Sequence, residues 1–148
     1  MINTKLPRTD TKSLSARIHH VSMLVENIDT YLENSFWCRQ SPIVYDPIQK
    51  CRLCLVSMQA DNDHLVELIE PVGEDSPVYQ ALRRGEKLQH LCLEMETRRD
   101  VDAFIRKYRL LPVTNWQSAE LFQGRLIRFA YTRNRELVEF VTHERGKE

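Results

Sequence analysis

Two stretches of similar sequence decide the fold, Ile18-His-His-Val-Ser-Met-Leu-Val-Glu26 and Leu88-Gln-His-Leu-Cys-Leu-Glu-Met-Glu96. Each reads as an apolar-rich strand that ends in acidic residues, and each is followed by apolar positions at helical spacing. Aligning the two strands puts His20 on His90, which lies 70 residues later. A repeat of this kind predicts that the chain contains the same structural unit twice.

The two units also close alike, with Leu65-Val-Glu-Leu68 in the first and Leu137-Val-Glu-Phe140 in the second. Their glutamates, Glu67 and Glu139, lie 72 residues apart. Runs rich in β-forming residues precede each closing strand. Each half is therefore predicted to be βαβββ, and the whole an α+β fold. The strands expected between helix and closing strand are Ile43–Tyr45 and Cys51–Met58 in the first half, and Leu111–Trp116 and Arg125–Thr132 in the second.

A short connector separates the two units. Ser76 can cap a helix that begins at Pro77, and Gly85 can end it. The sequence contains no long linker or low-complexity segment, so the two halves are expected to share one domain. The expected boundaries are a polar N-terminal segment at 1–17 and a single domain at 18–143, with modules at 18–71 and 88–143 and the connector at 72–87.

Composition limits the class of partner. At 148 residues, 42% of them hydrophobic, the chain is long enough for one core without disulfides. Lysine plus arginine equals aspartate plus glutamate at 21 each, so no overall positive charge attracts nucleic acid or an anionic membrane. No apolar run approaches the roughly 18 residues of a membrane span, and the start of the chain lacks the apolar core of a secretory signal. We expect a cytoplasmic homodimer with a small-molecule partner, and neither a nucleic-acid nor a membrane partner.

The pair Cys51-Arg-Leu-Cys54 looks like half of a zinc site. Its partner pair is missing, because Cys38 and Cys92 stand alone, and residues three apart in a strand point to opposite faces. Free thiols packed as small hydrophobic side chains are the favoured interpretation. Local basic pairs such as Arg83-Arg84 could bind a phosphate, although solvated helix charges are the favoured interpretation there.

Strand alternation indicates which side chains share a surface. In the first strand His20 and Ser22 face one way, whereas His19, Val21 and Met23 face the other. The repeat has the same alternation, so in both halves the apolar face is expected to pack under a helix. The residues expected beneath the helices are Val21, Met23, Leu91 and Leu93.

The opposite faces carry two histidines and two carboxylates, which suit a divalent ion such as Co²⁺, Ni²⁺, Zn²⁺ or Mn²⁺. Any one of these side chains alone is more often an ordinary solvated residue. Their occurrence at matched places in a duplicated unit favours a common site, because pseudo-symmetry brings equivalent strands together. From the residues alone, both interpretations remain open for His20, Glu67, His90 and Glu139.

This duplicated pattern resembles the vicinal oxygen chelate superfamily, the glyoxalase and bleomycin resistance proteins, whose two modules curl into a cleft around a metal. The resemblance covers about Ile18 to Val141. Within the superfamily, three motifs are similar in order and spacing to those of methylmalonyl-CoA epimerases, namely Glu67-Leu-Ile-Glu-Pro71, Asp75-Ser-Pro-Val78 and Leu88-Gln-His-Leu91. The resemblance implies a divalent metal held by His20, Glu67, His90 and Glu139, with Glu139 also acting as a catalytic base.

The chain departs from the epimerase pattern in three places. Phe36-Trp-Cys-Arg-Gln-Ser41 stands where the superfamily often has an aromatic residue followed by Leu-Gly, and Phe129–Arg135 lacks the usual His-Pro and Gly-Gly turn. Epimerases of this type also place a second catalytic Glu on the third strand of the first half, but Cys51–Leu55 contains no acid. Fold and metal are therefore implied more strongly than the reaction.

The second base consequently has no matched residue. Glu94 shares a face with His90, but four residues of strand separate them by ~13 Å, too far for a base at a common substrate. Asp46 or a thiol of Cys51 or Cys54 remains a candidate.

Three functions are compatible with these residues. The first is an epimerase or isomerase that abstracts the proton next to the carbonyl of an acyl-CoA thioester, with the metal stabilising the enolate. The second is a glyoxalase-I-like lyase, which uses the same ligand set on a glutathione thiohemiacetal. The third is a nonenzymatic protein of the same fold that binds a small molecule. The central motifs favour the first.

Overall fold

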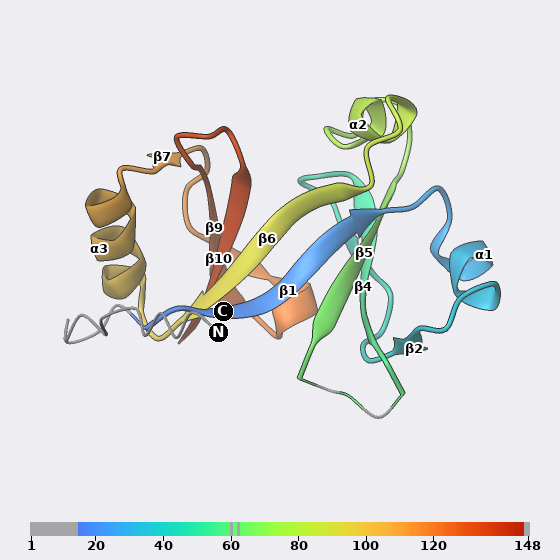
Figure 1. The fold of residues 1–148 in the computed structure, drawn as a ribbon, viewed down its shortest axis with the longest axis horizontal. Helices are drawn as coiled ribbons and strands as arrows, with labels where there is room; N and C mark the ends of the chain where they lie inside the picture. Colours follow the sequence, from blue (N-terminus) through green and yellow to red (C-terminus); the bar gives the residue numbers. More distant parts are fainter. Residues whose placement is uncertain (1–14, 60, 62, 147–148) are drawn as a thin grey trace, which may run out of the picture.

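The computed structural model describes residues 15–59, 61 and 63–146 of the chain (Figure 1). The polar segment expected at 1–17 thus lies mostly outside the described residues, and Arg17 begins the first strand. Within the described part, one mixed sheet of ten strands curves through the molecule. The elements are β1 (Arg17–Leu24), α1 (Ile28–Glu33), β2 (Cys38–Arg39), β3 (Val44–Asp46), β4 (Cys51–Ser57), β5 (Leu65–Pro71), α2 (Tyr79–Arg83), β6 (Leu88–Met95), α3 (Arg98–Tyr108), β7 (Leu111–Pro112), β8 (Gln117–Ala119), the 3-10 turn η1 (Glu120–Phe122), β9 (Arg125–Tyr131) and β10 (Leu137–Arg145).

The strand order is β2-β4-β5-β1-β6-β10-β9-β7, with β3 beside β4 and β8 beside β9. The first strands of the two halves, β1 and β6, run antiparallel at the centre. Each lies parallel to the closing strand of its own half, β5 or β10, and each closing strand pairs antiparallel with the strand before it. The predicted α+β fold with a curved mixed sheet is confirmed, and the repeat is visible in its topology.

The βαβββ prediction needs one correction. Each half has two short strands after its helix where one was expected: β2 and β3 in the first half, and β7 and β8 in the second. The predicted strand at Leu111–Trp116 is thus divided, since pairing with β9 stops at Pro112 and resumes at Gln117. The first helix, α1, ends at Glu33.

Helices α1 and α3 lie toward opposite ends of the sheet (Figure 1). Met23 packs against a core cluster that contains Ile28 of α1, and Leu93 packs against a cluster that contains Val101 and Ile105 of α3. These two residues lie beneath helices as predicted. Val21 and Leu91 instead line a groove beside α2, so the prediction is wrong for them.

The connector forms the short helix α2, which packs on the first half through the buried Val78. The predicted cap is wrong, because the hydroxyl of Ser76 donates to the backbone carbonyl of Gln49 (2.8 Å) and Val78 precedes the helix without a side-chain cap. Gly85 follows the helix with φ of 83°, a left-handed conformation that glycine adopts at little cost. Its predicted role at the helix end is confirmed.

All four cysteines are free. Cys51 and Cys54 are fully buried, but they belong to different core clusters, one beside α2 and the other beneath α1. This separation agrees with the prediction that residues three apart in a strand cannot share a zinc ion. None of the described helices is long and apolar enough to cross a membrane.

Candidate metal centre

The four predicted ligands lie together at the middle of the sheet. His20 comes from β1, His90 from β6, Glu67 from β5 and Glu139 from β10, four strands that are neighbours in the sheet. All four side chains are buried, with exposures between 0% and 6%. The antiparallel contact of β1 with β6 therefore joins the two halves of the site as well as the two halves of the fold.

Their donor atoms have the spacing of a coordination site. Nε2 of His20 lies 3.3 Å from Oε1 of Glu139 and 3.7 Å from Oε2 of Glu67. Nε2 of His90 lies 3.4 Å from Oε1 of Glu139 and 3.6 Å from Oε1 of Glu67. Ligands on a tetrahedral ion with bonds of ~2.0–2.1 Å are roughly 3.3–3.4 Å apart. Ligand atoms of three of these residues, His20, Glu67 and His90, all lie within 4.8 Å of one another. Glu139 lies beside both histidines, so the four side chains together are the candidate ligands of one divalent ion.

Two buried atoms support this fit. Nε2 of His20 and Oε1 of Glu139 have no hydrogen-bond partner among the described residues, although both are shielded from solvent. Buried polar atoms in proteins are nearly always paired, and those without a protein partner often contact an ion or a water molecule. The two unpaired atoms lie 3.3 Å apart, within the candidate ligand cluster.

The two carboxylates differ in electrostatic environment. Burial raises the pKa of Glu67 above its ordinary value, and His20 offsets this only in part. Burial would also raise the pKa of Glu139, but the adjacent imidazoles of His20 and His90 outweigh it and hold that pKa below its usual range. Burial disfavours charge on His20 as well, yet the carboxylates raise its pKa. Glu139 is therefore the more firmly ionised of the two carboxylates.

Ser22 connects ligands from the two halves. The hydroxyl of Ser22 donates to Oε1 of Glu67 (2.8 Å). Oγ of Ser22 also lies 2.7 Å from Nε2 of His90. The serine is fully buried and shares the face of β1 that carries His20, as strand alternation predicts. Alternation indicates the face on which Ser22 lies but not its contact with two ligands.

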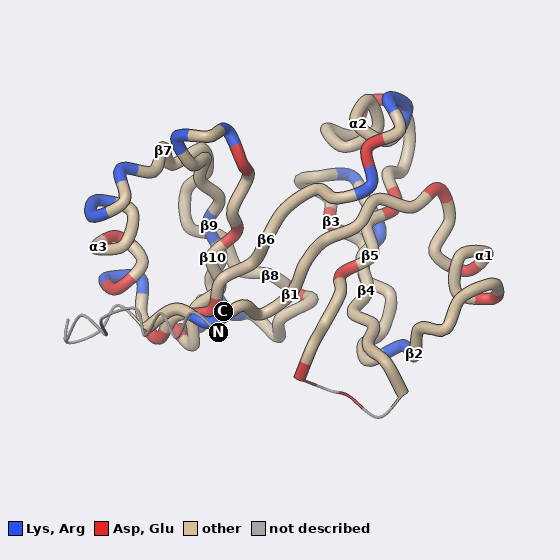
Figure 2. Tube along the Cα trace, viewed as in Figure 1, with Lys and Arg blue, Asp and Glu red and all other residues tan. Residues whose placement is uncertain are grey.

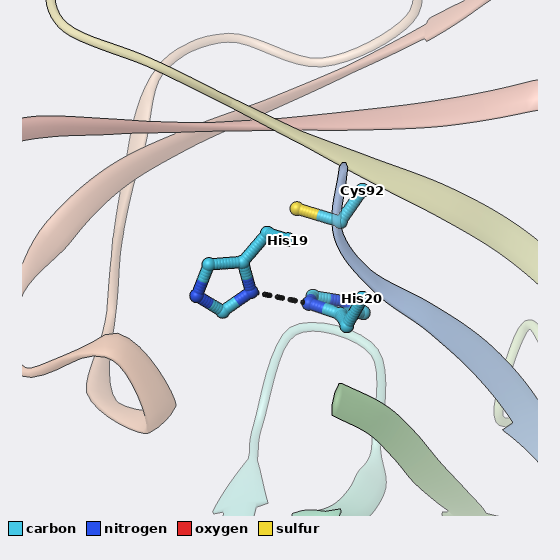
Figure 3. Close-up of side chains that lie close together, drawn as sticks. All are labelled: His19, His20 and Cys92. Carbon is cyan, nitrogen blue, oxygen red and sulfur yellow. Dashed lines mark hydrogen bonds between the residues drawn. The ribbon is translucent and has the colours of Figure 1, made fainter. Parts of the chain in front are cut away.

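His19 lies on a different face from the one predicted. A break in the β1–β6 register between Ile18 and His20 turns the His19 ring toward the site, where its Nδ1 is 2.8 Å from Nδ1 of His20 (Figure 3). The ring also meets Phe122 edge-on, with centroids 5.3 Å apart. Burial, reinforced by His20, lowers the pKa of His19 to about 4. A neutral His19 therefore holds the His20 ring so that Nε2 faces the other ligands.

Cys92 lies beside these two histidines (Figure 3), and ligand atoms of the three residues lie within 4.8 Å of one another. The thiol is fully buried, and burial, together with the charge of Glu139, raises its pKa well above the ordinary value. A protonated thiol is a poor metal ligand. The His20, Glu67, His90 and Glu139 set is therefore the better candidate.

A cavity of about 250 Å³ opens onto the ligands. Glu67, His90 and Glu139 line its inner end, and its walls are largely apolar. No lysine or arginine lines it among the described residues. Such a cavity suits a short, mostly apolar group whose polar atoms reach the ligand cluster. The apolar wall includes Val44, Leu53, Leu121, Phe122, Ile127 and Phe129.

Two acids line the cavity besides the ligands, Asp46 at the end of β3 and Glu120 at the start of η1. Oδ1 of Asp46 accepts from the backbone of Ile48 (2.8 Å), so this carboxylate also shapes the turn after β3. Asp46 was a candidate base from sequence. Glu120 was missed, because nothing in the local pattern indicates that the turn carrying it reaches the cavity.

The other candidate bases are excluded by their surroundings. Burial raises the pKa of Cys54 to about 11 and that of Cys51 further still, so both thiols are protonated at neutral pH. Glu94 forms ion pairs with Arg125 (2.6 Å) and Arg17 (3.0 Å) and does not line the cavity. The prediction that Glu94 is too remote to act as a base agrees with this position.

Comparison with solved structures shows the same fold. A hypothetical protein from Bacillus halodurans C-125 is 17% identical with a TM-score of 0.72, covering 90% of this chain and 99% of that one. Methylmalonyl-CoA epimerase from Mycobacterium tuberculosis is 18% identical with a TM-score of 0.71, covering 84% and 86%. A Streptomyces coelicolor methylmalonyl-CoA epimerase variant in complex with 2-nitronate-propionyl-CoA is 20% identical with a TM-score of 0.71, covering 89% and 98%.

No curated protein sequence matches the chain. Residues 18–125 match the sequence profile of the Glyoxalase/Bleomycin resistance protein/Dioxygenase superfamily. The match extends from β1 into β9 and so covers three of the four candidate ligands, His20, Glu67 and His90. The chain belongs to the Glyoxalase/Bleomycin resistance protein/Dioxygenase superfamily.

Proposed function

We propose that this protein is a metal-dependent epimerase or isomerase that moves a proton at the carbon next to a thioester carbonyl, with an acyl-CoA as substrate. The observation that carries the proposal is the cavity of about 250 Å³, lined at its inner end by Glu67, His90 and Glu139. A divalent ion held by these residues and His20 would stabilise the negative charge that an enolate carries on oxygen.

Glu139 is the proposed base on one side of the substrate. It is ionised at neutral pH, because the neighbouring histidines hold its pKa below the usual range. It lines the cavity, so a bound substrate would lie in contact with it. The same carboxylate is a proposed metal ligand, which limits the tests that its substitution can provide.

Inversion at the carbon requires a second group on the opposite face. Asp46 and Glu120 are the candidates that line the cavity from outside the ligand cluster. Asp46 already accepts a backbone hydrogen bond at Oδ1, which leaves Oδ2 for proton transfer. Glu120 is exposed at the mouth of the cavity.

The acyl-CoA assignment draws support from two sources. The motifs between Glu67 and Leu91 resemble those of methylmalonyl-CoA epimerases, and solved epimerases of the same fold hold 2-nitronate-propionyl-CoA or methylmalonyl-CoA. The absence of lysine and arginine from the described cavity lining suits the short acyl end of such a substrate better than its phosphates. We also propose that the protein is cytoplasmic and forms a homodimer.

The decisive experiment begins with elemental analysis of the purified protein. The metal-loaded protein is then incubated with methylmalonyl-CoA in deuterated water, and deuterium uptake and inversion at the α-carbon are followed separately. Both are expected. Loss of one acid–base partner typically lowers the reaction rate 10²–10⁴-fold. If Asp46 or Glu120 is the second base, Asp46→Asn or Glu120→Gln should slow inversion by that factor and slow deuterium exchange less.

Three outcomes would contradict the proposal. Failure of the protein to bind metal, even after exposure to Zn²⁺, Co²⁺, Ni²⁺ and Mn²⁺, would contradict the proposed metal site. Formation of lactoylglutathione from methylglyoxal and glutathione, with no exchange in any acyl-CoA, would identify a lyase of the same fold. No activity in either assay, together with tight binding of another small molecule, would identify a binding protein.

A further inference from the structure

A second hollow lies beside the β9–β10 turn, away from the metal ligands. It has a volume of about 540 Å³ and is lined by Arg109, Leu111, Tyr131, Thr132, Arg133 and Arg135. We call it the arginine hollow. Figure 2 shows the basic positions at the β9–β10 turn and at the end of α3. Three of its six lining residues are arginines, and no acid lines it among the described residues.

The charge of the arginine hollow is not neutralised by neighbours. No ion pair involves Arg109, Arg133 or Arg135 within the described part of the chain. Arg109 and Arg135 also have φ values of 54° and 67°, a left-handed conformation that residues other than Gly, Asn and Asp rarely adopt. Two long cationic side chains thus occupy positions where Gly, Asn or Asp is usual. Residues held in such sparsely populated backbone conformations occur preferentially at functional sites.

A groove of about 550 Å³ lies beside this hollow. Tyr131 and Arg135 line both the hollow and the groove, and His90 lines both the groove and the cavity. The groove passes between α2 and the β9–β10 turn, where Arg84 also lines it. Glu86 and Glu136 line the groove as well, and Glu86 pairs with Arg84 (3.0 Å). The arginine hollow itself has no acid among its described lining residues.

Strand geometry places the arginine hollow close to the cavity. Phe129 lines the cavity and Tyr131 lines the arginine hollow, and residues two apart in a strand share a face about 7 Å apart. Leu111 pairs with Tyr131 across the β7–β9 contact, and the two side chains are 65% and 40% exposed. An exposed aromatic ring beside a leucine offers a flat surface on which a nucleic-acid base can stack.

We propose that the arginine hollow binds the phosphorylated nucleotide end of a coenzyme A thioester whose acyl end lies in the cavity. Guanidinium groups bind phosphate through paired, charge-assisted hydrogen bonds, and Tyr131 supplies the stacking surface for adenine. The inference rests on the proposed function, because it assigns the other end of the same substrate. It accounts for the absence of cationic side chains from the described cavity lining.

The test uses adenosine 3′,5′-bisphosphate, which resembles this end of coenzyme A and has no thiol to bind a metal. Its affinity for the full-length protein is measured by calorimetry, alongside coenzyme A, pantetheine and inorganic phosphate. The test variant is Arg133→Asn/Arg135→Asn, because asparagine tolerates the left-handed conformation. The control is Arg39→Asn/Arg99→Asn, which removes the same charge from exposed positions outside the hollow and the groove.

The bisphosphate and coenzyme A are expected to bind, and the test variant to weaken both by about tenfold while the control variant binds as the parent does. Raising the salt concentration should weaken binding to the parent more than binding to the test variant. Undetectable binding to the parent, or equal affinity in the two variants, would overturn the proposal. Inorganic phosphate competing as well as the bisphosphate would overturn the nucleotide assignment.

The outcome is separable from that of the proposed function. Binding of the bisphosphate requires no proton transfer, so it can be observed in a protein that exchanges no deuterium. Conversely, deuterium exchange with an unchanged KM for methylmalonyl-CoA in the test variant would retain the reaction and reject the arginine hollow. Thermal unfolding of both variants at the parent temperature would confirm that neither substitution disturbs the fold.

Discussion

The two halves of the molecule contribute matched candidate ligands, but the residues that contact those ligands differ between the halves. In the first half, His19 contacts Nδ1 of His20, and Ser22 donates to Glu67. In the second half, Gln89 contacts Nδ1 of His90. Cys92, which occupies the position of Ser22, is a buried thiol beside Glu139 with a pKa raised by burial. The two halves thus carry matching candidate ligands, while the residues around them differ.

This divergence makes the two carboxylates chemically different. The pKa of Glu67 is raised mainly by burial, and that of Glu139 is lowered by the two histidines. A symmetric pair of carboxylates could not offer one firmly ionised group and one that holds its proton more readily. The asymmetry supports assigning the role of base to Glu139. It can be tested by substitutions in the two halves of the molecule.

The largest expected effect is the loss of a ligand. His20→Ala and His90→Ala should each lose most of the bound metal, because each removes one of four donors around a common centre. Metal content after dialysis, measured by elemental analysis, checks this. His64→Ala is the matched control, since His64 is exposed and pairs with Asp61. Equal metal content in all three variants would contradict the proposed site, and the comparison of the two halves would then not apply.

Ser22→Ala should have the next largest effect. It removes a hydroxyl that contacts Glu67 and His90 together, and partners of metal ligands typically contribute 10–100-fold in affinity. Cys92→Ala, at the equivalent place in the second half, should change affinity by less than about threefold, because the thiol offers only a weak hydrogen bond. Competition titration with a chromophoric chelator measures both. Similar losses in the two variants would mean that the halves support their ligands alike.

A smaller effect is expected from His19→Ala, about tenfold in metal affinity, because the His20 ring loses the contact that orients it. Strand alternation would make His19 a neutral control, but its ring points into the site. His19→Asn should recover part of the affinity, since its amide can still reach a ring nitrogen. An affinity identical to the parent in His19→Ala would show that Phe122 packing alone orients His20.

The smallest effect concerns stability. Glu94 lies in β6 at the place that the buried Leu24 occupies in β1, and Arg125 lowers its pKa below the ordinary value of 4.5 despite partial burial. A lowered pKa means that the ionised carboxylate stabilises the fold above about pH 4.5 and that this contribution is lost as the pH falls through the folded-state pKa. Glu94→Gln should lower Tm by about 1–3 °C at pH 7.

The pH dependence of that difference is the sharper test. The gap in Tm between parent and Glu94→Gln should close as the pH falls through the lowered pKa of Glu94, because the parent carboxylate becomes protonated there too. Thermal unfolding followed by circular dichroism from pH 3 to pH 8 measures the gap. A gap that is constant over this range would show that packing, and not charge, distinguishes Glu94 from its substitute.

The repeat explains why the clustering of the four candidate ligands could be predicted from sequence. His20 with His90, and Glu67 with Glu139, are identical residues at nearly equal offsets, and the fold that the pattern implies brings such strands together. His19 could not be placed, because a break in register reverses the side on which a residue lies and leaves no mark in the residue pattern. Glu120 and the arginine hollow depend on turns whose positions are set by tertiary packing.

The antiparallel seam between β1 and β6 has a consequence for the covalent chain. Each half supplies one histidine and one glutamate, and the segment 72–87 that links them contributes no ligand. A chain cut in that segment would yield two fragments that each hold half of the proposed coordination sphere. Metal uptake would then report fragment reassembly and would depend on the concentrations of both pieces, which would make the seam usable as a split sensor.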